Sequence, residues 1–157
     1  MNYSSINGPA GGVEPVNVDV FLNTTDATAN AIAIGDVVLI EPVAGKLTTA
    51  KVAVVANGLP SEMFGVALQA SVSNTAKIQV RVSGIAKVKC HEDADANKPL
   101  GVSGADAAHL ALMTTTVPAV GGAYAKQIGI GLVNTTTTGD LTSVLFDGIS
   151  GFSRGSK

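Results

Sequence analysis

The strongest constraint on the fold is one long alternating segment at residues 77–89, KIQVRVSGIAKVK. Its apolar members Ile78, Val80 and Val82 would lie on one face of a strand, with polar side chains between them on the other face. Shorter strand-like segments occur at residues 31–42, 46–55, 63–68, 126–132 and 141–146. Strands of this length and spacing predict an all-β sandwich or barrel.

The side chains available for the core are small. The chain has 22 Ala, 20 Val, 18 Gly and 14 Thr, against four Phe, two Tyr and no Trp. Val and Thr favour strands because branching at Cβ restricts the side chain, and Gly supplies turns. Charged residues make up 14% of the chain, whereas an average globular chain has about 25%. This composition favours a thin barrel whose surface is partly covered by other subunits, so we expect a homo-oligomer.

Charge and hydropathy exclude several classes of protein. The formal net charge is -2, and no basic cluster is present to hold phosphates, so we expect no nucleic-acid partner. No apolar segment approaches the roughly 18 residues of a membrane span, and the N-terminus lacks a signal-peptide pattern, so we expect no membrane partner. The single Cys90 excludes an intrachain disulfide framework. A soluble protein made in the cytoplasm is the expectation.

Three segments are predicted. Residues 1–29, rich in Gly, Pro and Asn, form an extended N-terminal arm; residues 30–150 form a single β domain; and residues 151–157 form a flexible tail. The arm contains one alternating stretch, Val16 to Val20, which predicts a strand outside the main body that pairs with a neighbouring chain. A flexible terminus is the alternative. The candidate binding residues of the arm are Val13, Val16, Val18, Val20 and Phe21.

Helix is expected to be scarce. Residues 105–112 are rich in Ala and could form one or two helical turns, but the three Thr that follow at 114–116 argue against a longer helix. The chain is therefore expected to contain at most one short helix.

One segment of the sequence has an internal echo. Residues 65–68, GVAL, are followed by Gly84, and residues 129–132, GIGL, are followed at the same interval by Gly148, with a constant offset of 64 residues. The shared pattern is a strand, a polar loop and a second strand that ends at a glycine. It predicts a hairpin used twice, and hence a pseudo-duplicated barrel built from two similar β units.

The chain is poor in groups that carry catalysis. Its one cluster of interest is Cys90-His91-Glu92-Asp93 with Asp95, and it lacks the second Cys or His pair of a familiar zinc site. Adjacent Cys and His on a strand point to opposite faces, which does not suit a nucleophile and its base. We interpret the cluster as a solvated acidic turn. No catalytic residue, metal ligand or cofactor site is assigned, and no enzyme activity is expected.

Five short motifs follow one another along the chain, namely Ile34-Gly35-Asp36-Val37-Val38, Phe64-Gly65-Val66-Ala67-Leu68, Val80-Arg81-Val82-Ser83-Gly84-Ile85, Gly129-Ile130-Gly131-Leu132 and Val144-Leu145-Phe146. Their order resembles that of the small capsid decoration proteins of tailed bacteriophages. The resemblance covers residues 30–149. It departs from the family pattern where Pro99-Leu100-Gly101-Val102 lacks the Gly-Asp that usually precedes the second half.

The resemblance implies a virion structural protein on the outer surface of the capsid, where it clamps neighbouring subunits of the major capsid protein. It also implies a small β-barrel or β-tulip-like body with extended arms, and a homotrimer as the favoured oligomer. Two alternatives stay open. One is a virion fibre or adhesin-type β module that binds host-surface glycans through the Thr-rich loops at residues 114–116 and 135–138, and the other is a head-completion or tail-tube protein.

Overall fold

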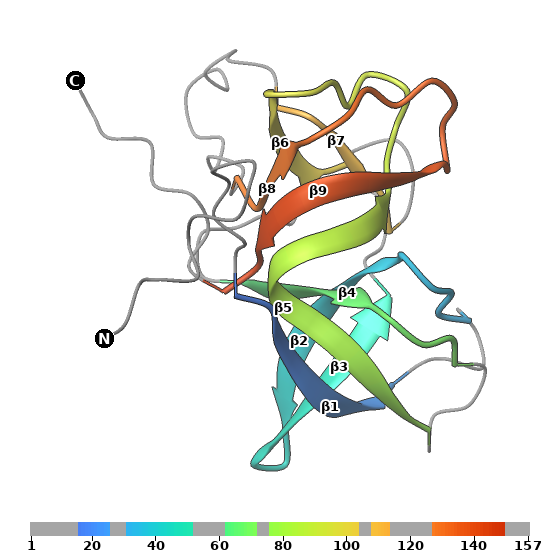
Figure 1. The fold of residues 1–157 in the computed structure, drawn as a ribbon. Helices are drawn as coiled ribbons and strands as arrows, with labels where there is room; N and C mark the ends of the chain where they lie inside the picture. The colour runs from blue at the N-terminus through green and yellow to red at the C-terminus, as the bar shows by residue number, and fades with distance from the viewer. Residues whose placement is uncertain are drawn as a thin grey trace, which may run out of the picture.

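The structure, a computed structural model, describes residues 16–25, 31–51, 62–71, 76–103, 108–113 and 127–149. These ranges contain strands and no helix, which confirms the predicted all-β class (Figure 1). The described residues thus include no helix that could cross a bilayer. The strands are β1 (Val18–Thr24), β2 (Val37–Val43), β3 (Lys46–Lys51), β4 (Met63–Ala67), β5 (Lys77–Lys89), β6 (Pro99–Val102), β7 (Leu110–Leu112), β8 (Gly129–Gly131) and β9 (Leu141–Asp147).

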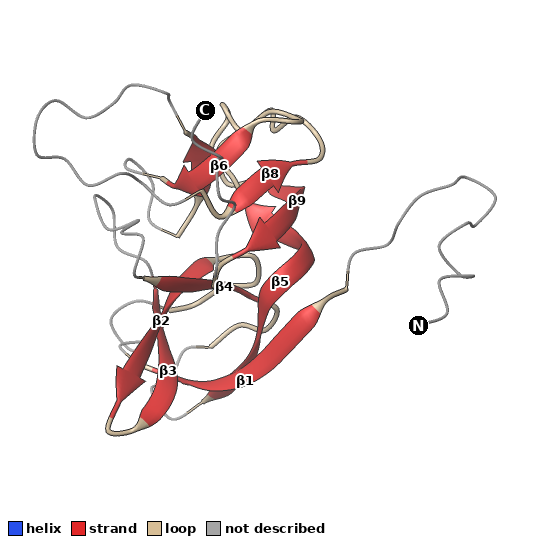
Figure 2. Ribbon diagram, turned by 90° about the vertical axis from the view of Figure 1, so that its left-hand side faces the viewer, coloured by secondary structure: helices blue, strands red, loops and turns tan. Residues whose placement is uncertain are grey.

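The first five strands close into a barrel, which we call the first unit (Figure 2). The strand order is β1-β3-β2-β4-β5, and β5 pairs back with β1. The β1–β3 pair is parallel and the other pairs are antiparallel. The predicted β-barrel is therefore confirmed. Its interior is filled by aliphatic side chains, most of them β-branched, namely Leu22, Ile32, Val38, Ile40, Ala67, Ile78, Val80 and Val82.

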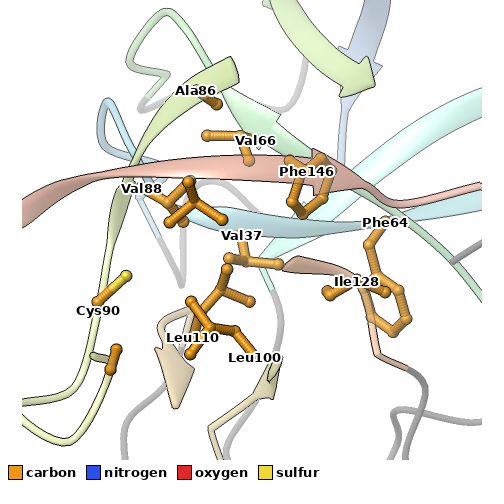
Figure 3. Close-up of a cluster of buried hydrophobic side chains, with 12 residues drawn as sticks. Val37, Phe64, Val66, Ala86, Val88, Cys90, Leu100, Leu110, Ile128 and Phe146 are labelled. Atoms are coloured by element: carbon orange, nitrogen blue, oxygen red, sulfur yellow. The ribbon is translucent and has the colours of Figure 1, made fainter. Parts of the chain in front are cut away.

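The second unit begins with the C-terminal part of β5 and continues through β9. Residues 83–89 of β5 pair with β9, which pairs with β8; β8 pairs with β6, and β6 with β7. One parallel bridge between Cys90 and Leu110 joins the end of β5 to β7 and completes the ring. Figure 3 shows the core that this unit encloses, which includes Ala86, Val88, Cys90, Leu100, Leu110, Ile128, Val144 and Phe146.

The second unit repeats the connectivity of the first. Each unit consists of five consecutive strands, and these pair in the same order and with the same parallel or antiparallel orientation. Strand β5 is the last strand of the first unit and also the first strand of the second. Val66 pairs with Arg81, and Ile130 pairs with Leu145, each 64 residues later in the sequence. The predicted double use of one hairpin is therefore confirmed, and the repeat extends to every strand pairing of the barrel.

The turn that precedes the second strand of each unit is also repeated. The Gly35 N–H donates to the Ala67 carbonyl at 2.8 Å, and the Asn97 N–H donates to the Gly131 carbonyl at 2.8 Å. Both residues have positive φ, +84° for Gly35 and +61° for Asn97. Asn is one of the few residues other than glycine that adopts this conformation readily. The Gly-Asp that the resemblance leads one to expect is thus replaced in the second unit by Asn97-Lys98.

Strands β2 and β4 form a wall between the two cores. Val38 faces the interior of the first unit, whereas Val37 packs with residues of the second unit. Ala67 and Val66 divide in the same way on β4. Residues 37–40 of β2 and 64–67 of β4 are therefore buried or half-buried on both faces, which explains why these segments are continuously apolar instead of alternating.

The predicted arm boundary at residue 29 is wrong for β1. This strand pairs with β5 from Val18 to Asn23 and with β3 at Asn23 and Thr24, so it closes the first unit instead of lying outside the body. Leu22 and Thr24 are buried inside the barrel, and Val20 packs against the same core. Without β1 the barrel would leave exposed strand edges, and closure removes them. Residues 1–15, and the predicted tail at 151–157, lie outside the described residues.

The predicted helical turns at residues 105–112 are replaced by a strand where the structure describes them. Residues Leu110–Leu112 form β7, in which Leu112 pairs with Leu100 and Ala111 with Gly101. Leu110 is buried in the second core. Helix propensity of Ala is a weak preference, and pairing with β6 together with burial of Leu110 overrides it. Residues 104–107 are outside the described ranges.

Candidate attachment surface

The five predicted arm residues do not act as one group. Val16, Val18 and Phe21 are surface residues, with 80%, 44% and 60% of each exposed. Val20 is instead partly buried against the core of the first unit. Val13 lies outside the described residues. The structure therefore leaves Val16, Val18 and Phe21 available to a partner, and we call these three the β1 surface.

A partly exposed ion pair between Asp19 and Arg81 links β1 to β5. Arg81 Nε lies 2.7 Å from Asp19 Oδ1, and Arg81 Nη2 donates to Asp19 Oδ2 at 3.0 Å. Gln79 Nε2 donates to the same oxygen at 3.0 Å. Hydrogen bonding from Arg81 lowers the pKa of the Asp19 carboxyl below its ordinary value, and Asp19 raises the pKa of Arg81 in return. Two parallel charge-assisted bonds fix geometry better than a single contact does.

The residues that precede β1 are anchored as well. Asn17 Oδ1 accepts a hydrogen bond from the Ile85 N–H at 2.9 Å. Gly84 allows this approach because a Cβ there would lie 2.8 Å from Asn17 Cα, and its φ of +115° also favours glycine. The sequence alone did not identify these partners of Asn17 and Asp19. Asp19 and Arg81 each occupy a polar position in a segment that alternates between apolar and polar residues, but only the strand register shows that they meet.

The cluster at residues 90–95 has a structural role. Cys90 is buried in the second core, and this burial raises the pKa of its thiol to about 11, although hydrogen bonds with Thr135 and Thr142 act in the opposite direction. Asp93 Oδ1 accepts from the Leu112 N–H at 3.1 Å and lies 3.1 Å from His91 Nδ1. Among the residues that the structure describes, no three His, Cys, Asp or Glu side chains are grouped so that they could hold a metal ion.

The Thr-rich loop at residues 135–138 is engaged in hydrogen bonds within the chain. Thr135 is buried and shares a hydrogen bond of 2.8 Å with Thr142. Thr136 Oγ1 donates to Asp140 Oδ2 at 3.4 Å, and Thr138 Oγ1 accepts from the Glu92 N–H at 3.3 Å. These hydroxyls stabilise the loop. The second Thr run, at residues 114–116, lies outside the described residues.

The five motifs behind the family resemblance all lie on strands or turns of the two units. Asp36 illustrates their role, because it is buried, its Oδ2 accepts from the Ala33 N–H at 2.8 Å, and its Oδ1 lies 2.7 Å from Lys89 Nζ. It thus closes a turn of the first unit and ties that turn to β5. At this position the motif therefore contributes to the fold.

Comparison with known proteins gives no relative. No known protein family matches the chain, and neither a curated protein nor a solved structure is similar to it at a significant level.

Proposed function

We propose that the protein is a virion structural protein that decorates the outer surface of a tailed-phage capsid and clamps neighbouring subunits of the major capsid protein. In this proposal it is made in the host cytoplasm, acts as a homo-oligomer, with a trimer favoured, and has no catalytic role. Support comes from the order of the five motifs and from a small-residue β-barrel. The observation that carries the proposal is the exposed β1 surface on a strand that an ion pair holds in place.

Attachment through this surface would use side chains. The main chain of β1 already pairs with β5, so we no longer expect the whole Val16–Val20 stretch to add as a strand to a capsid subunit. Burying one large apolar side chain contributes roughly 1.5 to 3 kcal/mol. The three side chains of the β1 surface would therefore give each copy modest affinity. Several copies joined in one oligomer would strengthen attachment through their multiple contacts.

The test is binding of the full chain to expanded, undecorated heads of tailed phages, measured by co-sedimentation. We expect saturable binding at high copy number for the wild type and weak binding for Phe21→Asp combined with Val16→Asp. Val133→Asp is the matched control, because Val133 is also an exposed apolar residue but lies in the loop after β8. Equal binding by the double variant and the wild type would rule out the β1 surface. Binding to host cells or polysaccharide, with none to heads, would contradict the proposed function itself.

A further inference from the structure

The two units of the chain meet through a defined interface. On the outer face of the first unit, cross-strand pairing places Val37, Val66, Arg81 and Asp19 side by side in one row. The second unit covers the apolar half of this row, since Val37 and Val66 are fully buried in its core. The Val37 N–H donates to the carbonyl of Ala108, the residue two before β7, at 2.8 Å. Within the chain, the residues that lead into β7 of the second unit therefore lie on the outer row of the first unit.

The second unit has an equivalent row that is partly accessible in the described structure. Its members, by the repeated register, are Pro99, Ile130, Leu145 and Ile85. All four are half-buried or exposed, and 38% of Ile85 is accessible. The charged pair Asp19 and Arg81 of the first row is replaced here by Ile85 and Leu145. The second row is therefore more apolar than the first, although its side chains stay partly accessible.

The first unit also has an exposed counterpart of Ala108. Glu41 pairs with Thr48 in the β2–β3 hairpin, and at the equivalent place between β6 and β7 the Ser103 N–H donates to the His109 carbonyl. Leu47, one residue before Thr48, is therefore the equivalent of Ala108, one residue before His109. Leu47 is 49% exposed and pairs with Pro42, so these two side chains share one face of the hairpin near its end. A Cβ added at Gly45, in the turn between them, would meet no atom within 4 Å. Figure 1 shows this hairpin extending from the barrel, away from the second unit.

We propose that Leu47, near the tip of the β2–β3 hairpin of one copy, binds the outer row of the second unit in another copy. The contact would repeat between molecules the arrangement that the two units already have within one. It joins two different surfaces, so it is a head-to-tail contact, which produces a closed ring when the rotation between copies closes. This inference rests on the homo-oligomer part of the proposed function and assigns the surfaces that form it.

The intermolecular contact would differ from the internal one in one respect. Pro99 stands where Val37 stands in the first unit, and proline has no N–H to donate. The hydrogen bond that Val37 makes to Ala108 therefore has no counterpart, and the contact between copies depends on apolar side chains. An interface of this kind is expected to be weaker than the one between the units and to dissociate on dilution.

The test measures the oligomeric state of the full chain by sedimentation velocity over a range of concentrations. We expect the wild type to associate, and Leu47→Lys and Leu145→Glu each to weaken association at least tenfold. An equimolar mixture of the two variants should associate again, because the unchanged hairpin of the Leu145→Glu chain can bind the unchanged row of the Leu47→Lys chain. Thr137→Lys, in the exposed β8–β9 loop, is the control for added charge and should behave like the wild type. Circular dichroism of each variant checks that it is folded.

Each other outcome overturns the inference in a distinguishable way. Association that persists in both variants would show that copies meet through other surfaces, while the homo-oligomer itself would stand. A wild type that is monomeric at every concentration would contradict both the inference and the homo-oligomer, and attachment to heads would be judged by its own assay. Single variants that associate normally but no longer bind heads would assign the two surfaces to the capsid protein instead of a second copy.

Discussion

Among the glycines of the described residues, Gly148 leaves the least room for a side chain, and its neighbour is Phe64 of β4. A Cβ at this position would lie 2.0 Å from the Phe64 carbonyl oxygen and 2.6 Å from its carbonyl carbon. The main chain cannot move away easily, because the Phe64 N–H donates to the Gly148 carbonyl at 2.9 Å. We expect Gly148→Ala to lower the free energy of unfolding by about 2 to 4 kcal/mol, measured by urea denaturation.

Gly45→Ala is the control for this substitution. Gly45 has a φ of +76° but open space around its Cα, so an added methyl group causes backbone strain without a clash. The expected loss is about 1 kcal/mol. Equal losses for the two variants would show that contact between the units does not depend on the close approach at Gly148.

The Asp19–Arg81 ion pair gives the stability of the protein a specific pH dependence. Hydrogen bonding from Arg81 lowers the pKa of Asp19 in the folded state below the ordinary value of 3.8, so the pair stabilises the fold above that pH. The contribution is lost as the pH falls through the lowered folded-state pKa. For this partly exposed pair we expect Asp19→Asn to cost about 1 kcal/mol at pH 7. Urea midpoints at pH 7, 4 and 2.5 should show the difference shrinking with acidification.

Glu92→Gln serves as the comparison for the pH series, because Glu92 is an exposed carboxylate in the turn after β5. It should leave the urea midpoint nearly unchanged at all three pH values. A constant difference between Asp19→Asn and the wild type down to pH 2.5 would contradict the linkage, since it would mean that the Asn side chain itself, and not the lost charge, destabilises β1.

Cys90 should be chemically silent in the folded protein. Burial raises the pKa of its thiol to about 11, so almost none of it is thiolate at pH 8, and only the thiolate reacts readily. We expect no labelling by a thiol-specific disulfide reagent at pH 8 until denaturant is added, after which one thiol per chain should react. Rapid labelling of the native protein would contradict the burial of Cys90 in the second core.

At the scale of single elements, the position of β1 determines which N-terminal truncations leave the barrel intact. Deleting residues 1–15 removes none of the described contacts, so the melting temperature should stay close to that of the full chain. Deleting residues 1–29 removes the strand that closes the first unit, together with Leu22 and Thr24 from its interior. Large-to-small changes at buried sites already cost about 2 to 5 kcal/mol each, so this deletion should prevent stable folding of the barrel.

Thermal melts followed by circular dichroism distinguish the two truncations. A protein that lacks residues 1–29 and melts like the full chain would show that β1 is dispensable and would restore the predicted arm boundary. Head binding by the shorter truncation, with the β1 surface intact, is expected to be close to that of the wild type.

The elements that could be predicted from the sequence are those whose pattern reflects burial on one face. The alternation of residues 77–89 predicted β5, and its apolar face is the buried one. The alternation at Val16–Val20 also predicted a strand correctly, but not its partner, because strand pairing between distant segments leaves no local signal. At β7 the local preference of Ala pointed to helix, and the pairing with β6 decided otherwise. The exposed Val16, Val18 and Phe21 could be named as candidates, while the ion pair between Asp19 and Arg81 depended on the register.

At the scale of the whole molecule, the echo of GVAL in GIGL revealed one repeated hairpin, but the complete repeat is visible only in the structure. Equivalent positions hold residues of different chemistry, such as Gly35 and Asn97 or Thr24 and Cys90, which meet the same backbone or packing requirement. The two units also differ in environment, since Val66 is buried by the second unit and its equivalent Ile130 is half-exposed. Divergence of this kind removes sequence identity while it preserves register.

The sharing of β5 predicts that the two units unfold together. The strand contributes Ile78, Val80 and Val82 to the first core and Ala86 and Val88 to the second. The second core is completed by Val37, Phe64 and Val66 on strands β2 and β4 of the first unit. If the first unit opened alone, β5 would lose two pairing partners and the second core would lose one of its walls. Separate unfolding of either unit is therefore expected to be unfavourable.

Ile78→Ala tests this coupling, because Ile78 is buried in the first unit, far along β5 from the second core. The substitution should cost about 2 to 4 kcal/mol, with urea unfolding remaining a single transition. Native-state hydrogen exchange should show the same loss of protection for the slowest amides of β8 and β9 as for those of β2 and β4, because all of them open through one global event. Leu132→Ala, at an exposed position after β8, should change neither set. Two unfolding steps, or β9 amides that keep their full protection in Ile78→Ala, would show that the second unit can stay folded when the first is destabilised, and that the shared strand joins two independent barrels.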